Sequence, residues 1–463
     1  MGAQALSVRE WAIVLPAAAF AAGRLVARSR TLAAVIGLAG ASIPAVAMLL
    51  GVAGRATRRG PGPAEGQALH DDAADTATEP VIVVIPARDE ATVIGPILHD
   101  LASQDLRAAD GRLGFEVVVI DDRSTDGTGQ RARAAILDAG IRESASVHRR
   151  DAGPDGKGAA LAWLGTPESG ITVVFDADAR IGRDVVRRLV ETVGVTRKAA
   201  TARRRVLLPA GGLWRRRLAR LQDDELTVDG AVQLARAALG GGSELRGNGM
   251  VVPNEALVAA GGWPAGAVTE DLELSTQLYL HTGDGIAWLP GIEVREQPVL
   301  RLDHLAGQRL RWAEGAIRRD IRRVLPTILE NRGRLRARTD MAIYAGHLLL
   351  GWFLLGLAAG GRRGRMVAGV LVAGYGAGAT MLAADALSRF GDAAPSPRLR
   401  KLGRAIAVAA FAGAWLPVTA AAWIRVAIRG DAAHFDRTVK TDEFESTTAP
   451  LATTHRDGAG PAR

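Results

Sequence analysis

The chain has 463 residues, which is enough for more than one domain and for a core that needs no crosslinks. Hydrophobic residues make up 48% of the chain and charged residues 23%, so apolar and charged segments must be separated, as in a membrane protein with a water-soluble body. The absence of cysteine excludes disulfides, thiolate catalysis and cysteine-ligated metal sites. The net charge of +9 gathers beside apolar segments, which favours anionic lipid headgroups over nucleic acid as the partner.

Residues 1–59 are predicted to form a membrane region of one or two helices. Thr31 to Gly54 carry no charged side chain and can cross the roughly 30 Å hydrocarbon layer as one helix. The shorter apolar stretch from Trp11 to Ala22 is compatible with a first span, an interfacial helix or part of a signal. A cleaved signal peptide is disfavoured because the second apolar segment follows so closely. Residues 60–80 are rich in Pro, Gly, Ala and Asp, which is typical of a flexible linker.

The next part of the chain, residues 81–316, is predicted to be a soluble α/β domain. Strands buried on both faces of a parallel sheet are apolar at every position, and three short runs have this pattern: Val81–Ile85, Val117–Ile120 and Ile171–Phe175. Helices are indicated between them at Thr92–Ser103 and Gly129–Ala139. This alternation predicts a mostly parallel sheet covered by helices.

The chain then returns to the membrane. Residues 317–340 are predicted to form a basic amphipathic helix on the membrane surface, with its arginines on one side and apolar residues on the other. Residues 341–430 hold three apolar segments near spanning length, and residues 431–463 are predicted to be a partly disordered tail. The three segments are Met341–Gly360, Met366–Ala384 and Ala405–Ile424.

Membrane topology contains a conflict at this stage. If the soluble body faces the cytosol and all three C-terminal segments span, the tail lies outside the cell. The basic clusters Arg24–Arg30 and Arg362–Arg365 would also face outward, against the positive-inside tendency. One of the five apolar segments is therefore expected to be re-entrant or interfacial.

Acidic residues follow the predicted strands at the sheet edge where ligands bind in open α/β folds. Asp89 and Glu90 follow the first strand, Asp121 and Asp122 end the second, and the segment from Asp176 to Asp178 ends the third. Carboxylates brought this close repel one another unless something positive shares the site. A divalent cation, a nucleotide or an arginine would provide that charge.

The spacing of Asp176 and Asp178 suits one hard cation such as Mg²⁺ or Mn²⁺, because alternate strand residues point to the same side. Phosphate oxygens of a nucleotide diphosphate would complete its coordination. The alternative interpretation is a cap on the helix beginning near Ile181. Asp121 and Asp122 can likewise belong to a capped turn. Lys157 lies in a glycine-flanked loop that lets the backbone approach a phosphate or base.

Together these segments resemble the family 2 glycosyltransferases of GT-A fold, and in particular the membrane branch that includes cellulose, chitin and hyaluronan synthases. The resemblance covers about Val81 to Gly315. It rests on six elements in order: Ile85-Pro86-Ala87-Arg88-Asp89-Glu90, in which Asp89 replaces the usual Asn; Asp121-Asp122-x-Ser124; Asp176-Ala177-Asp178; Gly261-Gly262-Trp263-Pro264; Thr269-Glu270-Asp271; and Gln308-x-x-Arg311-Trp312.

The resemblance implies a Rossmann-like GT-A catalytic domain inserted between N-terminal and C-terminal transmembrane helices. It implies that Asp271, beside Glu270, is the general base that deprotonates the acceptor hydroxyl. Asp178 and Asp176 would hold Mg²⁺ or Mn²⁺, and Arg311 would stabilise the departing diphosphate. The residues expected to bind substrate are Ala87, Asp89, Glu90, Asp121, Asp122, Lys157, Asp176, Gln308 and Trp312. For Trp312, packing of the body against an interfacial helix is the alternative role.

The predicted function is inverting, metal-dependent transfer of a sugar from a nucleotide-diphosphate donor, UDP by first choice, to a polysaccharide or lipid-linked acceptor. The predicted location is the cytoplasmic face of the plasma membrane, in a multi-pass protein. Transfer of one sugar to a lipid such as a polyprenyl phosphate, hopanoid or carotenoid is the alternative. A further alternative is a protein that is not an enzyme, either a membrane transporter or a nucleotide-binding regulator. Transporters usually place ionisable residues within their membrane spans, and the acids here lie outside the spans. The sequence identifies no protein partner.

Overall fold

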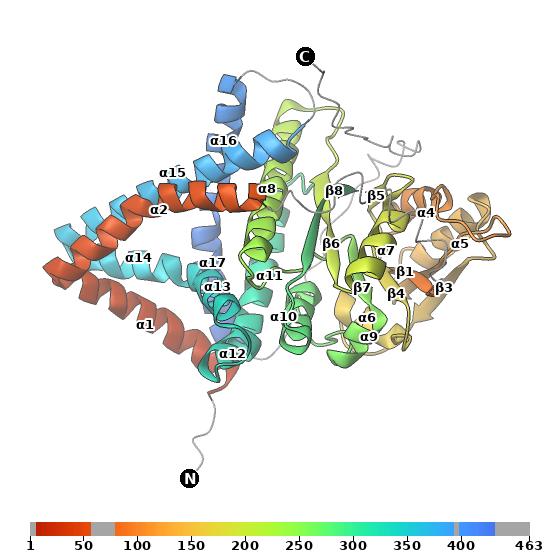
Figure 1. Ribbon diagram of the computed structural model, residues 1–463, viewed down its shortest axis with the longest axis horizontal. Helices are drawn as coiled ribbons and strands as arrows, with labels where there is room; N and C mark the ends of the chain where they lie inside the picture. The colour runs from red at the N-terminus through yellow and green to blue at the C-terminus, as the bar shows by residue number, and fades with distance from the viewer. Residues whose placement is uncertain (1–5, 57–78, 393–397, 431–463) are drawn as a thin grey trace, which may run out of the picture.

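The computed structural model describes residues 6–56, 79–392 and 398–430. The predicted tail, the Arg437-Thr438-Val439-Lys440 segment within it and nearly all of the predicted linker lie outside these ranges. Figure 1 shows an α/β body on one side and long helices that project from it on the other.

An eight-stranded sheet in the order β3-β2-β1-β4-β7-β6-β8-β5 forms the centre of the body. Strands β3, β2, β1 and β4 pair parallel to one another, and β1, β2 and β4 form because their apolar, β-branched residues are buried on both faces. Their bounds are β1 Val81–Ala87, β2 Glu116–Asp122, β3 Ala145–Arg150 and β4 Ile171–Val174. Strands β1, β2 and β4 confirm the three predicted strands, with ends that differ by at most two residues.

The other half of the sheet is mixed. Strand β7 runs antiparallel to β4 and β6, β6 is parallel to β8, and the short β5 is antiparallel to β8. The bounds are β5 Arg180–Ile181, β6 Ala200–Val206, β7 Met250–Pro253 and β8 Ala287–Glu296. Because β7 reverses direction next to β4, the loop before β7 lies beside the carboxyl end of β4.

Helices cover both faces of the sheet (Figure 1). Predicted helices Thr92–Ser103 and Gly129–Ala139 are present as α4 and α5, with small shifts at their ends. The bounds of the covering helices are α4 Ile94–Ala102, α5 Thr128–Asp138, α6 Lys157–Leu164, α7 Val185–Thr196, α9 Asn254–Ala259 and α10 Glu270–Thr282. Two apolar clusters, one on each face, hold them to the sheet.

Four long apolar helices make two arms that leave the body and meet at a distant tip (Figure 1). Helix α1 packs along α14, and α2 packs along α15. At the tip the Arg363 guanidinium donates to the carbonyl of Arg28, 3.1 Å away, so the basic residues flanking both turns gather there. The bounds are α1 Val8–Arg28, α2 Arg30–Ala56, α14 Leu350–Ala359 and α15 Arg362–Phe390.

Small residues allow the paired helices of each arm to approach closely. A Cβ added at Gly356 would overlap the carbonyl oxygen of Phe20, and one added at Gly374 would overlap that of Gly40. Helices in lipid associate through such close van der Waals contact, because lipid chains provide no hydrophobic driving force between them. These glycines therefore set the spacing of both arms.

Helices α16 (Arg398–Gly413) and α17 (Trp415–Arg429) follow one another across the base of the arms (Figure 1). At one end Ala405 and Val408 pack on the end of α15. At the other end the carbonyl of Gly430 accepts from Arg318 at 2.6 Å, close to the start of α1. The pair thus joins the two arm bases on the side that faces the body.

By length and composition, four helical segments among the described residues can cross a membrane: Val8–Arg28, Leu335–Ala359, Arg362–Phe390 and Leu399–Arg429. The apolar stretch from Trp11 to Ala22 is thus part of a longer helix, α1. Helix α2 covers the predicted span from Thr31 to Gly54 and has 27 residues.

The predicted interface helix 317–340 is wrong in two respects. Helix α11 (Leu302–Arg319) continues into a π-helical turn at Asp320–Val324, followed by α12 (Leu325–Leu329) and, after a break, α13 (Leu335–Gly346). Arg318 and Arg319 are buried in ion pairs with Glu314 and Glu244, and the more exposed Arg323 pairs with buried Glu273 at 2.5 Å. Buried acidic partners, rather than lipid headgroups, therefore balance these three arginines of the basic face.

Candidate active site

A cluster of charged side chains lies at the carboxyl end of β4, where the loop before β7 and the start of α10 approach it. The Lys157 ammonium, at the start of α6, donates to Asp176 at 2.5 Å and to the carbonyl of Gly247 at 2.7 Å. It also lies 3.8 Å from Glu270. The glycine-flanked loop predicted to approach a ligand thus brings a cation between two of the predicted site acids.

Glu270 and Asp271, in the first turn of α10, are the most perturbed acids of this cluster. Burial raises the pKa of Glu270 to about 7, and repulsion from Asp271 adds to the effect while Lys157 opposes it. Burial also raises the pKa of Asp271, against the attraction of Arg246, a backbone N–H and Lys157. A carboxylate with a raised pKa is suited to accept a proton near neutral pH.

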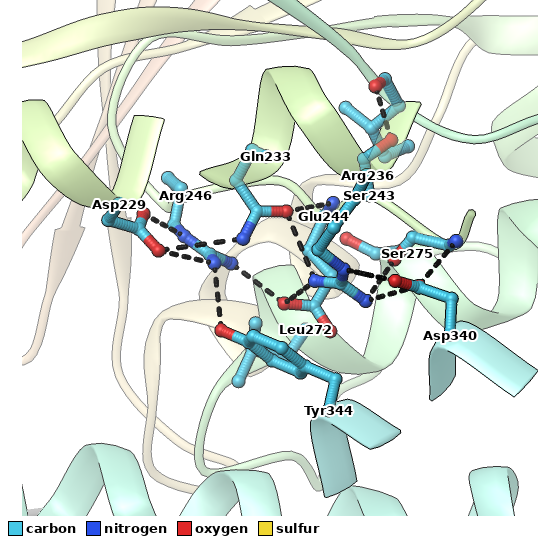
Figure 2. A network of polar contacts seen from close by, with 12 residues as sticks. Asp229, Gln233, Arg236, Ser243, Glu244, Arg246, Leu272, Ser275, Asp340 and Tyr344 are labelled. Carbon is cyan, nitrogen blue, oxygen red and sulfur yellow. Dashed lines mark hydrogen bonds and ion pairs between the residues drawn. The ribbon is translucent and has the colours of Figure 1, made fainter. Parts of the chain in front are cut away.

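Arg246 is fixed by a buried polar network that reaches from α8 (Leu213–Ala238) to α13 (Figure 2). Its guanidinium donates to both oxygens of Asp229 at 2.6 and 3.0 Å, to Glu244 at 3.0 Å and to the hydroxyl of Tyr344 at 3.3 Å. Burial disfavours ionised Glu244, but three surrounding arginines outweigh it and hold its pKa well below the usual range. Arg246, the cation that faces Asp271, is thus fixed in position by hydrogen bonds to three side chains.

A second arginine, Arg204 on β6, faces the same acids. It makes a two-pronged ion pair with Glu296, at 2.6 and 2.9 Å. Burial alone would lower the pKa of Arg204, but Glu296, Asp176 and Asp271 outweigh it and the pKa is raised. Its guanidinium also lies 5.8 Å from the ring centre of Trp312, within the range of a cation–π contact.

Asp176 and Asp178 provide two carboxylates, too few to hold a hard cation unless other ligands complete its coordination. Asp178 is buried, and its Oδ2 accepts from the backbone N–H of Gln297 at 3.0 Å, while Asp176 holds Lys157. Within the described ranges, no group of three or more His, Asp or Glu side chains is placed to hold a metal. Mg²⁺ bound by one or two carboxylates typically takes its other ligands from substrate phosphates and water. The residues fit a cation that binds together with a diphosphate.

The acids after β1 and β2 form a separate cluster. The Asp89 side chain accepts from the Thr125 N–H at 2.7 Å, and Asp89 adopts a left-handed conformation with φ 52°. The N–H of Glu90 donates to the hydroxyl of Thr128 at 2.8 Å. Ala87 is buried at the end of β1. These contacts connect the two strand ends, as the capped-turn interpretation of this segment requires.

Arginines relieve the repulsion between Asp121 and Asp122. Arg149 donates to Asp121 at 3.0 Å, whereas Arg123 and Arg150 both donate to Asp122 at 2.9 Å. Arginine, one of the partners considered from the sequence, fills this role here, whereas at Asp176 the partner is a lysine, which was not considered.

Asp155 links this cluster to the one around Lys157. Arg88 and Arg123 bind its carboxylate at 2.5 and 2.8 Å, and this contact positions the loop that leads into α6. Both groups of predicted donor-binding residues thus border one loop.

Gln308, Arg311 and Trp312 lie on α11, between the sheet and the membrane helices. Gln308 and Trp312 line a narrow cleft together with Glu296 and Gln297, next to the Arg204 ion pair. Arg311 is partly buried on the same helix. On its other side, Trp312 stacks on Trp415 of α17, with ring centres 6.4 Å apart and planes inclined by 13°. Trp312 therefore combines the two predicted alternatives, a cleft wall and a packing contact with a membrane-side helix.

Several residues of this site were not predicted from the sequence. Arg204 and Arg246 face the acids, Gln297 binds Asp178, and Glu225 on α8 binds both Arg309 at 2.6 Å and the indole N–H of Trp415 at 2.7 Å. A sequence signal exists for Arg246, which precedes the glycine-flanked Asn248. Arg204 lies in a run of three arginines inside a strand, and such a run looks like a solvated surface.

Comparison with known proteins agrees with this arrangement. Residues 82–234 match the family described as Glycosyl transferase family 2, and residues 171–383 match Glycosyl transferase family group 2. A mannosyltransferase from Pyrobaculum calidifontis, solved in complex with GDP-Man and Mn²⁺, superposes with a TM-score of 0.53 at 19% identity, over 85% of this chain and 98% of that one. At this identity the likeness shows the fold.

The curated relatives are named beta-monoglucosyldiacylglycerol synthase. The protein from Synechocystis sp. is 36% identical over 261 residues, which are 54% of this chain and 50% of the relative. The one from Nostoc sp. is 34% identical over 273 residues, 57% of this chain and 54% of the relative. The chain thus spans about half the length of the curated relatives it matches. Residues 82–383 carry the domains of a family 2 glycosyltransferase with an α/β, GT-A-like fold.

Proposed function

We propose that this protein transfers one glucose from a nucleotide-diphosphate donor, UDP-glucose by first choice, to the hydroxyl of a membrane lipid, with diacylglycerol as the leading acceptor. The relatives' names support a lipid acceptor and a single sugar better than a polysaccharide product. The observation that carries the proposal is the pair Glu270 and Asp271 at the start of α10, where loss of contact with water raises the pKa of both carboxyl groups.

Asp271 acts as the general base in this reaction. The acceptor oxygen attacks the anomeric carbon, the bond from that carbon to the diphosphate oxygen breaks, and Asp271 takes the hydroxyl proton. Direct displacement inverts the anomeric configuration. Burial supports the role, because a carboxylate with a raised pKa is a stronger base than an exposed one.

Cations stabilise the departing diphosphate, on which negative charge develops. Asp176 orients Lys157, Glu296 orients Arg204, and Arg311 is one turn or less from Gln308 on α11. Asp176 and Asp178 would hold Mg²⁺ or Mn²⁺, which supplies Lewis-acid stabilisation of the diphosphate when bound. Asp121, Asp122, Asp89 and Glu90 border the loop before Lys157 and are assigned to the nucleoside half of the donor.

The proposed location is the cytoplasmic face of the plasma membrane, and the apolar helices support the membrane part of this proposal. The described chain has four segments long and apolar enough to cross a membrane, and α11 contacts α17 directly. A lipid acceptor can therefore reach the charged cluster from the bilayer while the donor arrives from the cytosol.

The test is transfer by the purified full chain in nanodiscs. Incubation with radiolabelled UDP-glucose, Mn²⁺ and diacylglycerol is expected to give one labelled lipid that carries a single glucose, with none when diacylglycerol is omitted. A ladder of longer products would contradict single transfer, and absence of labelled lipid with every nucleotide-glucose would contradict the proposed reaction.

Asp271→Asn tests the assigned base. Transfer is expected to fall by roughly 10²–10⁴-fold, the usual contribution of a general base. Asp138→Asn, at an exposed carboxylate on α5, is the matched control and should keep full activity. Unchanged transfer by Asp271→Asn would show that another group takes the proton.

A further inference from the structure

An apolar cavity of about 350 Å³ lies inside the angle between the two arms. Leu350 and Leu354 of α14 form one wall, α15 forms another, and Ala409 and Ala410 of α16 close the base. Its size falls in the range of roughly 300–1,000 Å³ that is typical of small-molecule sites. The lining is almost entirely hydrocarbon, so the occupant must be hydrocarbon too.

Among the described residues, one polar group in this lining has no hydrogen-bond partner. Tyr375 of α15 lines the cavity, and no described residue makes a hydrogen bond with its hydroxyl. The other hydroxyl of the lining, on Thr380, donates to the carbonyl of Gly376 at 2.8 Å. A phenol within hydrocarbon needs an acceptor for its proton. The ester carbonyl of a lipid would supply one.

A line of side-chain contacts joins the edge of the cavity to the charged cluster. Leu416, at its edge, is the neighbour of Trp415 in α17. Trp415 stacks on Trp312, and Arg204, 5.8 Å from the ring of Trp312, interacts with both Asp176 and Asp271. The end of the cavity at Leu416 is thus the end connected to the proposed base.

We infer that this cavity holds one hydrocarbon chain of the lipid acceptor, with the Tyr375 hydroxyl donating to an ester carbonyl of that lipid. The inference rests on the proposed transfer to a lipid and adds where the lipid is held. The competing occupant is bulk lipid, and in that case the rate of transfer would not depend on the acyl-chain length of the acceptor. If the cavity instead holds the acceptor's chain, transfer depends on the length of that chain.

The chain offers a matched pair of glycines for the test. Gly376 lines the cavity, and a Cβ added there meets no atom within 4 Å. Gly369, two turns earlier on α15, is not part of the lining, and an added Cβ there also meets no atom. Gly376→Leu fills the cavity, whereas Gly369→Leu places the same side chain on the same helix outside it.

Transfer is measured over a series of diacylglycerols with acyl chains of six to eighteen carbons. Gly376→Leu is expected to raise the KM for the longest acceptors at least tenfold, with a loss that shrinks as the chain shortens, whereas Gly369→Leu follows the wild type. The increase in thermal stability produced by UDP with Mn²⁺ should be the same in all three proteins, which shows that the donor site is intact.

Tyr375→Phe tests the polar contact separately. It is expected to raise the KM for diacylglycerol more than for the corresponding ether lipid, which lacks the ester carbonyl. If Gly376→Leu matches Gly369→Leu at every chain length, the cavity holds only bulk lipid and the inference is wrong, while transfer by the wild type still supports the proposed function. If the wild type glucosylates no lipid, both are wrong.

Discussion

At the scale of single residues, the pair Glu270 and Asp271 controls the chemistry through its titration. Two buried carboxyl groups next to each other release their protons in linked steps. Lys157 opposes the rise in pKa that burial causes in both groups, and the charge of Asp271 raises the pKa of Glu270 further. The pair is therefore poised to change charge close to neutral pH.

A pH dependence of the transfer rate follows. Asp271 must be ionised to act as the base, and burial raises its pKa, so kcat/KM should increase with pH and level off only above the ordinary titration range of an aspartate. Glu270→Gln removes a negative neighbour and is expected to move this inflection to lower pH. Lys157→Met removes a positive neighbour and should move it to higher pH. Initial rates at saturating metal from pH 5 to 9 give all three curves, and shifts of the same sign in both variants would contradict the electrostatic explanation.

The metal site predicts linked binding of cation and donor. Only two carboxylates of the described chain, Asp176 and Asp178, are assigned to the cation, so its other ligands must come from the diphosphate and water. Mn²⁺ alone is expected to change the melting temperature little, and Mn²⁺ with UDP to raise it by more than the sum of the separate effects. Asp178→Asn should abolish this excess. A full shift with Mn²⁺ alone would point to a complete protein site.

The positions of candidate site residues were predictable from the sequence where those residues belong to compact motifs, whereas their roles stay predictions. Asp176, Asp178, Glu270 and Asp271 belong to compact motifs, and the structure places three of these four around Lys157. Arg246 could not be assigned in this way, because its partners Asp229 and Tyr344 come from α8 and α13 and approach only in the folded chain.

At the scale of elements, the close pairing of the arm helices depends on glycine. Gly356 faces Phe20 of α1, and no side chain fits between them. Gly356→Leu is expected to destabilise the protein by about 1–3 kcal/mol, the usual cost of overpacking, and to lower its melting temperature in detergent. Gly37→Leu is the control, because a Cβ at Gly37 meets no atom within 4 Å. Equal melting temperatures for the two variants would show that the arms are not packed as described.

Elements were predictable wherever their residues follow one period. The buried strands and the long apolar helices are continuous patterns, and both were identified from the sequence. For the segment after Trp312, the same reasoning from periodicity predicted a helix on the membrane surface, and this prediction was wrong. Its arginines have helical spacing, but Arg319 is neutralised by Glu244, which is 75 residues away in the sequence and only 2.8 Å away in space. Periodicity within one helix contains no information on such a partner.

At the scale of the whole molecule, the fold suggests an answer to the topology conflict. Helices α16 and α17 join the bases of the two arms and pack on α11 and α8, so they lie beside the body rather than along the arms (Figure 1). We therefore propose that the two arms provide four crossings, by α1, α2, the segment ending in α14, and α15, and that Leu399–Arg429 does not cross although its length and composition would allow it. With this even number of crossings, the body and the end of α17 are expected on the same side of the membrane.

The absence of native cysteine makes this topology testable without background labelling. Single cysteines are introduced at Gly361, in the tip, at Leu399, the 83% exposed residue near the start of α16, and at the exposed Asp138 of the body. An impermeant maleimide added to intact cells should label only the tip variant, and permeabilised cells should show labelling of all three. Labelling of Leu399→Cys in intact cells would mean that α16 and α17 cross the membrane.

The stack of Trp312 on Trp415 has one more consequence, which concerns the length of the product. Because this contact fastens the helix beside the catalytic acids to a helix at the membrane surface, the reaction takes place at a fixed height above the bilayer. A lipid hydroxyl lies at that height, but after glucose is attached, the new terminal hydroxyls lie one sugar farther from the membrane surface. We therefore expect transfer to stop after the first addition, because the hydroxyls of the product no longer lie at the height of the catalytic acids.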